Sequence, residues 1–327
     1  MKTLHTVAAC LLLLAAIRST SRSSEAVASV RSPMTFVVMI ASPQEEKSAA
    51  VLVKSIRAFG GDYSSAPVVL VLADPTAADG RSLAASVQET VVLKMNEKFR
   101  TFPFSDKVYA CAQVEALVAD KTDWLVWLNP DCLVVAPPGA IAADRQAWAA
   151  LRPVHVQNIG NTRNVGSPVD APIPEYWERI YRAAGLDPAQ TWTVESLVDQ
   201  QKMRGYFNSG CMAFVPAKGI LRAWRDVYES LLSDPASFAF YTSNSPYSIF
   251  CHQAVLSAVV MAKAGKSRVN NLAPAYGYPL GLQDFPGFTN RIGALSDLVI
   301  VISGTQDNFR KIRVVEPLRS WIDANVK

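Results

Sequence analysis

Residues 123–131 read DWLVWLNPD, an apolar run that ends in a polar turn. Every position from 124 to 128 is hydrophobic, which is typical of a strand buried on both faces. Asn129, Pro130 and Asp131 then supply residue types that favour a turn. The stretch therefore predicts a buried strand whose carboxyl end presents an amide and a carboxylate.

Three more apolar runs precede this strand, at residues 35–41, 68–73 and 90–93. Helical spacing of apolar residues separates them, over 45–59 and again over 106–119. Buried strands that alternate with helices predict a mainly parallel sheet with helices on both faces. In such sheets the ligand crevice lies beyond the carboxyl ends of the strands, where both Asp74 and Asp131 are expected.

The second half of the chain has a less regular pattern. We expect strands at 152–157 and 212–215, helices at 219–232 and 251–264, and long loops at 158–173 and 272–290. Loops of this length inside a compact domain are more often functional than idle. Neither a low-complexity linker nor an internal repeat is visible, so residues 29–327 are treated as one domain of the α/β class.

Composition excludes one class of partner. The chain has 327 residues, of which 50% are hydrophobic and 18% charged, with a formal net charge of +4. No run of five like charges occurs, so the concentrated basic face that nucleic-acid binding requires is missing from the sequence.

The first 28 residues are typical of an export signal. Lys2 precedes an uncharged apolar run at 7–17, and Ala26-Val27-Ala28 fits a small-x-small cleavage site. We expect export to the cell exterior, the periplasm or the secretory lumen, with an uncleaved membrane anchor as an open alternative. A wrongly assigned start codon is the other alternative, and no further membrane contact is expected.

The cysteines beyond that segment show no spacing that indicates a zinc site or a disulfide framework. They are Cys111, Cys132, Cys211 and Cys251. Each lies in an apolar context, so we expect small buried hydrophobic side chains.

Four segments, in chain order, resemble the GT-A-type nucleotide-diphospho-sugar transferases. Residues 123–131 resemble their strand followed by Asp-x-Asp, and 152–161 lie where they have an inner strand and loop. The sequence YFNSG at 206–210 resembles a segment that lines the site in retaining galactosyltransferase-like and glycogenin-like members. His252-Gln253 is similar to their Asp-Gln element, so the resemblance spans about residues 34–260.

The resemblance implies a GT-A-like, Rossmann-like mixed sheet that is mainly parallel and flanked by helices. It also implies transfer of a sugar from a nucleotide-diphosphate donor to a hydroxyl of a carbohydrate, lipid or protein acceptor, with retention. In the family a divalent cation such as Mn²⁺ or Mg²⁺ stabilises the leaving diphosphate as a Lewis acid. Here Asn129 replaces the first carboxylate, Asp131 is retained, and residues 299–306 lack the family's histidine ligand.

Three interpretations of this altered turn remain open: an enzyme with a variant metal site, a metal-independent transferase, or a non-catalytic protein that binds carbohydrate or nucleotide sugar. The resemblance implies that Asp131, with help from Asn129, holds the diphosphate through a metal or water. Lys107 opens the helix before the strand, and a lysine there can neutralise phosphate.

The same resemblance assigns Asn208, Gly210 and Gln253 to the sugar subsite, with Gln253 and Asn208 as the catalytic candidates. An asparagine can both donate and accept hydrogen bonds to sugar hydroxyls, and a glycine permits close approach. Asp74 is expected to contact the nucleoside. His155 is expected to be a core or rim histidine with its hydrogen bonds satisfied, rather than a catalytic base.

Overall fold

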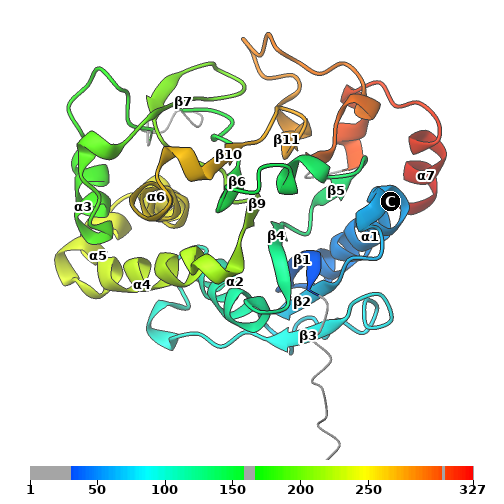
Figure 1. Ribbon diagram of the computed structural model, residues 1–327, viewed down its shortest axis with the longest axis horizontal. Coiled ribbons are helices and arrows are strands. Elements are labelled where there is room, and N and C mark those ends of the chain that lie inside the picture. The colour runs from blue at the N-terminus through cyan, green and yellow to red at the C-terminus, as the bar shows by residue number, and fades with distance from the viewer. Residues whose placement is uncertain (1–30, 158–165, 304–305, 327) are drawn as a thin grey trace, which may run out of the picture. The chain divides into compact units, whose positions relative to one another are not determined.

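The strand predicted at residues 123–128 is β4 (Thr122–Leu128), the central strand of a seven-stranded sheet in the computed structural model (Figure 1). The structure describes residues 31–157, 166–303 and 306–326, and residues 31–327 form one unit. The export signal predicted at 1–28 therefore lies outside the described residues.

The sheet has the order β10-β6-β9-β4-β1-β2-β3. Its other strands are β1 (Ser32–Ile40), β2 (Val68–Leu72), β3 (Glu89–Val92), β6 (Ala149–Leu151), β9 (Cys211–Phe214) and β10 (Val269–Asn271). The first four strands of the chain in this sheet, β1 to β4, are mutually parallel, and β9 runs antiparallel to both β4 and β6. The predicted mixed, mainly parallel sheet is confirmed.

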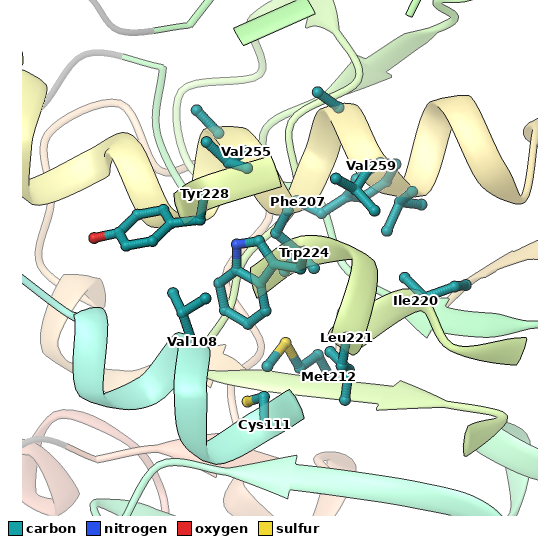
Figure 2. Packing of buried hydrophobic residues seen from close by; sticks show 14 of the residues in the cluster. Val108, Cys111, Phe207, Met212, Ile220, Leu221, Trp224, Tyr228, Val255 and Val259 are labelled. Atoms are coloured by element: carbon teal, nitrogen blue, oxygen red, sulfur yellow. The ribbon is translucent and has the colours of Figure 1, made fainter. Parts of the chain in front are cut away.

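Alternate residues of the buried strands point to opposite faces of the sheet, because side chains along a strand alternate with a period of two. On β1, Phe36 and Val38 pack against α1 (Pro43–Phe59), whereas Val37 joins the core on the other face. That second face is covered by α2 (Ser105–Val118), α4 (Ile220–Ser233) and α6 (Ser245–Lys263). Figure 2 shows how side chains from these helices and from β9 surround Trp224.

A smaller sheet lies beside the carboxyl end of β4. It consists of β5 (Cys132–Val134), β11 (Tyr278–Pro279) and β12 (Ile300–Ile302), and β12 runs antiparallel to β5. The pairing of Ile302 with Cys132 places the residue after β12 next to the turn that follows β4. The remaining elements are a hairpin of β7 (Thr193–Glu195) and β8 (Lys202–Arg204), and the helices α3 (Glu175–Ala184), α5 (Pro235–Thr242) and α7 (Leu318–Asn325).

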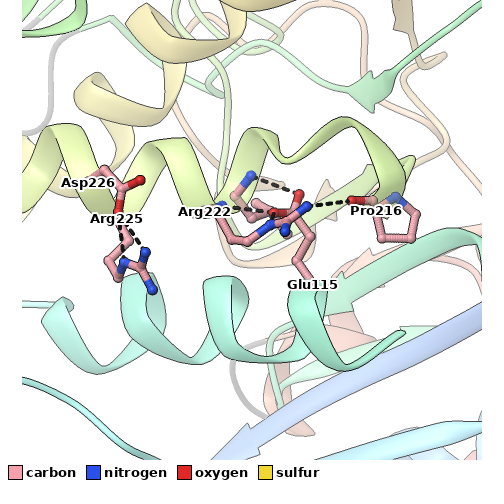
Figure 3. A network of polar contacts seen from close by, with 6 residues as sticks. Glu115, Pro216, Arg222, Arg225 and Asp226 are labelled. Carbon is pink, nitrogen blue, oxygen red and sulfur yellow. Dashed lines mark hydrogen bonds and ion pairs between the residues drawn. The ribbon is translucent and has the colours of Figure 1, made fainter. Parts of the chain in front are cut away.

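Helix α4 obtains its N-terminal cap from another helix. It begins after Gly219, which adopts a left-handed φ of 67° and offers no side chain to the first backbone N–H groups. The carboxylate of Glu115 on α2 accepts the N–H groups of Leu221 and Arg222, both at 2.9 Å, and the Nε–H of Arg222 at 3.0 Å (Figure 3). A buried carboxylate thus ties α2 to α4 and satisfies two of the amides that a helix start leaves unpaired.

Two boundaries differ from the sequence-based expectation. The inner strand lies at 149–151, so the strand expected at 152–157 is wrong; beyond Leu151 only an isolated bridge between Pro153 and Phe207 remains. Proline has no N–H to donate to a ladder, which accounts for the end of the strand there. Helix α6 begins at Ser245, six residues before the predicted start.

The four cysteines beyond the first 30 residues are buried and free, as expected for small hydrophobic side chains. In the part of the chain that the structure describes, no helix combines the length and hydrophobicity that crossing a bilayer requires.

Candidate functional site

The candidate site lies at the topological switch point of the sheet. The chain passes from β1 outward to β2 and β3 and then returns to place β4 on the opposite side of β1. A crevice for ligands is expected at the carboxyl ends of two such strands. Two cavities open at this position, with volumes of about 450 Å³ and about 330 Å³. Phe104, Lys107 and Asn129 line both cavities, and we call these three residues the shared wall.

The smaller cavity adjoins the end of β1 and the start of α1. Met39, Gln44, Glu45 and Ser48 line it from those elements, and Asp131 lines it from the turn after β4. The larger cavity is formed by segments that are distant in sequence. Its polar lining includes His155, Asn208, Ser209, His252, Gln253 and Asn308.

The turn after β4 is fixed by three backbone hydrogen bonds. Asn129 donates its N–H to the carbonyl of Gly210 at 2.9 Å, and its own carbonyl accepts the N–H of Cys132 at 3.0 Å. The carbonyl of Asp131 accepts the N–H of Ser303 at 3.0 Å and its hydroxyl at 2.8 Å. The position at which the family's histidine was sought therefore does lie beside Asp131, but it holds a serine.

The orientation of the Asn129 side chain follows from its neighbour on β4. Trp127 donates its indole Nε1–H to Oδ1 of Asn129 at 3.3 Å, and an indole can only donate. The oxygen of the amide is therefore turned toward Trp127. The Nδ2 atom lies on the side of Gly210, 3.2 Å from the position that a Cβ on that glycine would take.

Lys107 is buried in the shared wall, with 5% of its surface exposed. Its ammonium lies 3.4 Å from the carbonyl oxygen of Ser209 and 5.4 Å from the ring centroid of Phe104. Burial lowers the pKa of Lys107, because removing a charge from water disfavours the charged form. The charges of Asp106 and Asp131 lie near enough to favour its charged form. An anion bound at this wall would stabilise that charge.

Phe104 has a strained backbone at the site. Its φ of 62° lies in the left-handed region that residues other than glycine rarely adopt, at a cost of about 1–2 kcal/mol. The ring stacks on His252 with centroids 4.3 Å apart, and 42% of the residue surface remains exposed. Its position in both cavity walls, together with the strain, points to a role in ligand binding that the sequence pattern did not reveal.

Ser209 connects the two residues of the His252-Gln253 pair. Nδ1 of His252 lies 2.8 Å from the carbonyl oxygen of Ile249, which can only accept, so Nδ1 carries the proton. Nε2 is then an acceptor, and the Ser209 hydroxyl donates to it at 3.0 Å. The backbone N–H of Ser209 donates to Oε1 of Gln253 at 3.0 Å. Burial lowers the pKa of His252 well below its usual value, so this histidine orients its neighbours as a neutral group.

Asn208 and Gly210 meet the turn after β4 at close range. Oδ1 of Asn208 accepts the N–H of Gly210 at 2.7 Å, and a Cβ on Gly210 would lie 3.1 Å from that oxygen. Both residues line the larger cavity together with Gln253. The structure thus brings five sequence-predicted residues to one cavity: Lys107, Asn129, Asn208, Gly210 and Gln253.

His155 differs from the expected core or rim histidine in one respect. Both of its ring nitrogens are buried and have no hydrogen-bond partner among the residues that the structure describes, although the residue lines the larger cavity. Burial lowers its pKa to about 3, with a contribution from the nearby charge of Arg152. A neutral imidazole with one unused donor and one unused acceptor is suited to a sugar hydroxyl.

Asp74 is not brought to either cavity. It is exposed after β2, where its carboxylate accepts the N–H of Thr76 at 2.9 Å and the hydroxyl at 2.6 Å. The side-chain and backbone hydrogen bonds from Thr76 lower its pKa. This is an Asx-type turn, and the role of Asp74 toward a nucleoside stays a prediction.

The residues at the turn do not fit the divalent cation that the resemblance implies. Hard cations take oxygen ligands, and where the family has a second carboxylate and a histidine this chain has only neutral groups: the Asn129 amide, whose Oδ1 already accepts the Trp127 indole N–H, and the Ser303 hydroxyl, which donates to the Asp131 carbonyl. Asp131 is then the one carboxylate of the turn. Over residues 31–157, 166–303 and 306–326, no group of three His, Cys, Asp or Glu side chains has the geometry to hold a metal.

Sequence reasoning missed Phe104, Ser303 and Asn308 as cavity residues. Ser303 and Asn308 reach the site through the pairing of β12 with β5, which joins segments about 170 residues apart and leaves no local pattern. No residue in the segment around Phe104 favours its left-handed backbone, so this conformation could not be predicted from the sequence.

Three solved structures are similar to this chain. Among solved structures, the bifunctional glycosyltransferase WbbM matches with a TM-score of 0.52 and 14% identity, covering 90% of this chain and 52% of that chain. The galactosyltransferase LgtC, solved with donor and acceptor sugar analogues, matches at 0.49 and 17% identity over 82% of this chain and 86% of that one. GlyE of Streptococcus pneumoniae matches at 0.48 and 13% identity over 91% and 61%. At these identities the likeness concerns the fold alone.

No curated protein matches the sequence. A family model does match, over residues 36–265, and it describes the Rhodobacterales glycosyltransferase domain. This range includes residues 36–40 of β1, the whole of β2 to β4, the turn after β4, the YFNSG segment and all of α6. With that match over most of the described residues and a GT-A-type fold, the chain belongs to the Rhodobacterales glycosyltransferase domain family.

Proposed function

We propose that this glycosyltransferase domain takes its sugar from a nucleotide-diphosphate donor and transfers it, with retention, to an acceptor hydroxyl. The single observation that carries the proposal is the pair of adjoining cavities with Lys107 in their shared wall. A nucleotide sugar has three parts in a row: a nucleoside, an anionic diphosphate and a sugar. The site has matching parts in the same order: one cavity, the buried cation Lys107 in the shared wall, and the second cavity.

The smaller cavity suits the nucleoside. Its lining combines the apolar side chain of Met39 with the polar groups of Gln44, Glu45 and Ser48 at the start of α1. Carboxylate and amide oxygens accept hydrogen bonds from ribose hydroxyls and base N–H groups. The diphosphate then lies against Lys107, and the sugar enters the larger cavity.

The larger cavity suits a neutral sugar and the acceptor. Asn208, Gln253 and His155 supply donors and acceptors for hydroxyl groups, and no carboxylate occurs among its described lining residues. Phe104 and Phe250 add apolar surface on which a sugar ring can pack. Within this cavity the bond between the anomeric carbon and the diphosphate oxygen breaks. The acceptor oxygen then bonds to that carbon, and its proton leaves with the diphosphate.

Gln253 is the candidate closest to the reacting carbon. Its Oε1 accepts the Ser209 N–H at 3.0 Å and lies 3.3 Å from the Ser209 hydroxyl, whose single proton goes to His252. A lone pair therefore remains with which this oxygen can stabilise positive charge at the anomeric carbon. The neutral His252 holds Ser209 and thereby fixes this oxygen. Asn208 is positioned by the N–H of Gly210 and is the second catalytic candidate.

The test is a turnover assay on the full chain with UDP- and GDP-sugars and a panel of carbohydrate, lipid and peptide acceptors. We expect nucleoside diphosphate release from at least one donor, and a fall of about a hundredfold in Gln253→Ala, in line with the loss of one preorganised electrostatic group. Gln190→Ala, at an exposed position in a surface turn, is the matched control and should retain full activity. Binding of nucleotide without release from any donor would instead favour a non-catalytic nucleotide-sugar-binding protein.

We also propose export through residues 1–28, on the pattern of Lys2, the apolar run and Ala26-Val27-Ala28. Mass spectrometry of the mature N-terminus tests it. Cleavage after Ala28 is the expected result for a signal peptide, and an intact N-terminus in a membrane fraction indicates an anchor. An intact N-terminus in the soluble fraction would contradict the proposal.

A further inference from the structure

We infer that the diphosphate of the donor is held directly by Lys107 and the amide of Asn129, without a bridging divalent cation. The inference rests on the proposed donor site and specifies how that site manages the charge of the leaving group. Three features of the shared wall carry it.

The first feature is the orientation of Asn129. Its oxygen accepts the indole N–H of Trp127, so its NH₂ group is turned toward Gly210, which lines the larger cavity. An NH₂ group cannot ligate a metal ion, but it donates hydrogen bonds to phosphate oxygens. At the position where an oxygen ligand is required for a cation, this chain therefore presents a donor for an anion.

The second feature is the burial of Lys107. Its ammonium has three donors, and within the described part of the chain it makes one hydrogen bond, the long contact of 3.4 Å to the Ser209 carbonyl. A charged donor removed from water forms stronger hydrogen bonds to phosphate than an exposed one, because water does not compete. The cation lies in the walls of both cavities, where the diphosphate of an extended donor would pass.

The third feature is the placement of the carboxylates. Glu45 and Asp106 line the smaller cavity, but each lies in the first turn of a helix, where the positive end of the helix dipole offsets its charge. Oε2 of Glu45 accepts the N–H of Ala41 at 2.6 Å, and Oδ1 of Asp106 accepts the N–H of Lys107 at 2.7 Å. Asp131 is the remaining carboxylate near the phosphates, and by itself it does not form a cation cage.

The experiment is calorimetric titration of the full chain with UDP and with GDP, once in EDTA and once in excess Mn²⁺. We expect the better nucleotide to bind in EDTA with a Kd within about threefold of that in Mn²⁺. Lys107→Met should weaken binding about 10- to 100-fold in both buffers, the range for one charge-assisted hydrogen bond. Methionine keeps the length and the apolar stem of the lysine, so the buried wall stays filled.

Asn129→Asp supplies the sharper test, because it is isosteric and restores the missing carboxylate. It should weaken binding in EDTA by about tenfold or more and make binding depend on Mn²⁺. Asn271→Asp is the matched control, since Asn271 is exposed at the end of β10 and outside both cavities. Its Kd should not change in either buffer.

Two results would overturn the inference, and they are distinguishable. Wild-type binding that appears only with Mn²⁺ contradicts direct phosphate binding and leaves the proposed donor site intact. Absence of binding by either nucleotide in both buffers contradicts the proposed function itself, and the inference with it.

Discussion

Replacing Glu115 by alanine should destabilise the protein more than any change at an exposed carboxylate of the same region. The side chain of Glu115 is 0% exposed and accepts two backbone N–H groups at the start of α4. Each buried amide left without a partner costs about 1–3 kcal/mol, so two amides give about 2–6 kcal/mol. Arg222 is 40% exposed on its side chain and can turn to water, so it adds little to the loss.

The assay is urea denaturation followed by circular dichroism and by the fluorescence of the buried Trp224 of α4, whose indole N–H donates to the carbonyl of His252 on α6. Glu115→Gln keeps one oxygen acceptor for the backbone N–H groups. Burial raises the pKa of Glu115, which means that its charge is partly disfavoured in the folded protein, so losing the charge destabilises less than losing the acceptor oxygens. Glutamine should therefore cost about half as much as alanine.

Asp226→Ala is the matched control on α4, since this carboxylate is 62% exposed and pairs with the neighbouring Arg225 (Figure 3). Its effect should stay within about 0.5 kcal/mol, as for surface ion pairs in general. An equal, small effect of Glu115→Ala and Asp226→Ala would refute the capping role of Glu115.

Three further changes have defined outcomes. The pKa values of His155 and His252 are lowered by burial, to about 3 for His155, so below pH 6.5 the unfolded state binds more protons on these two residues than the folded state does. The free energy of unfolding should therefore fall with decreasing pH, by up to about 1.4 kcal/mol per pH unit for each histidine, and His155→Phe should remove one of the two contributions; a flat profile contradicts this. His155→Phe should also raise the KM for the sugar donor or the acceptor about 10-fold. His155→Asn keeps one hydrogen-bond donor and one hydrogen-bond acceptor, so its KM should stay close to that of the wild type; equal KM values for His155→Phe and the wild type would show that His155 binds no hydroxyl. Gly210→Ala should cost about 1–3 kcal/mol of stability and weaken nucleotide binding, because its Cβ would lie 3.1 Å from Oδ1 of Asn208, whereas Gly293→Ala, with open space at its Cβ, should change neither.

Most of the sheet could be predicted from the sequence because its strands are buried on both faces. Runs such as residues 68–72 and 124–128 have no polar position, so their strand character does not depend on the rest of the fold. The short strands β5 and β12 were not predicted, because their pairing joins segments about 170 residues apart and each has only three residues. The inner strand was placed too late because Pro153 and its apolar neighbours resemble a strand but cannot extend the ladder.

Part of the candidate site could also be predicted from the sequence. Asn129, Asn208, Gly210 and Gln253 stand in segments with a recognisable pattern, and they do meet in one cavity. The orientation of the Asn129 amide could not be predicted, since it depends on an indole N–H two residues earlier on the strand. The missing partners of His155 are likewise a property of the packed cavity.

The most direct test of the account is a crystal structure of the full chain with a bound nucleotide sugar. The account predicts the nucleoside in the smaller cavity beside Met39 and Glu45, the diphosphate within hydrogen-bond distance of Nζ of Lys107, and the sugar in the larger cavity near Asn208 and Gln253. A nucleotide sugar bound away from the shared wall, or with its diphosphate out of reach of Lys107, would contradict the central claim.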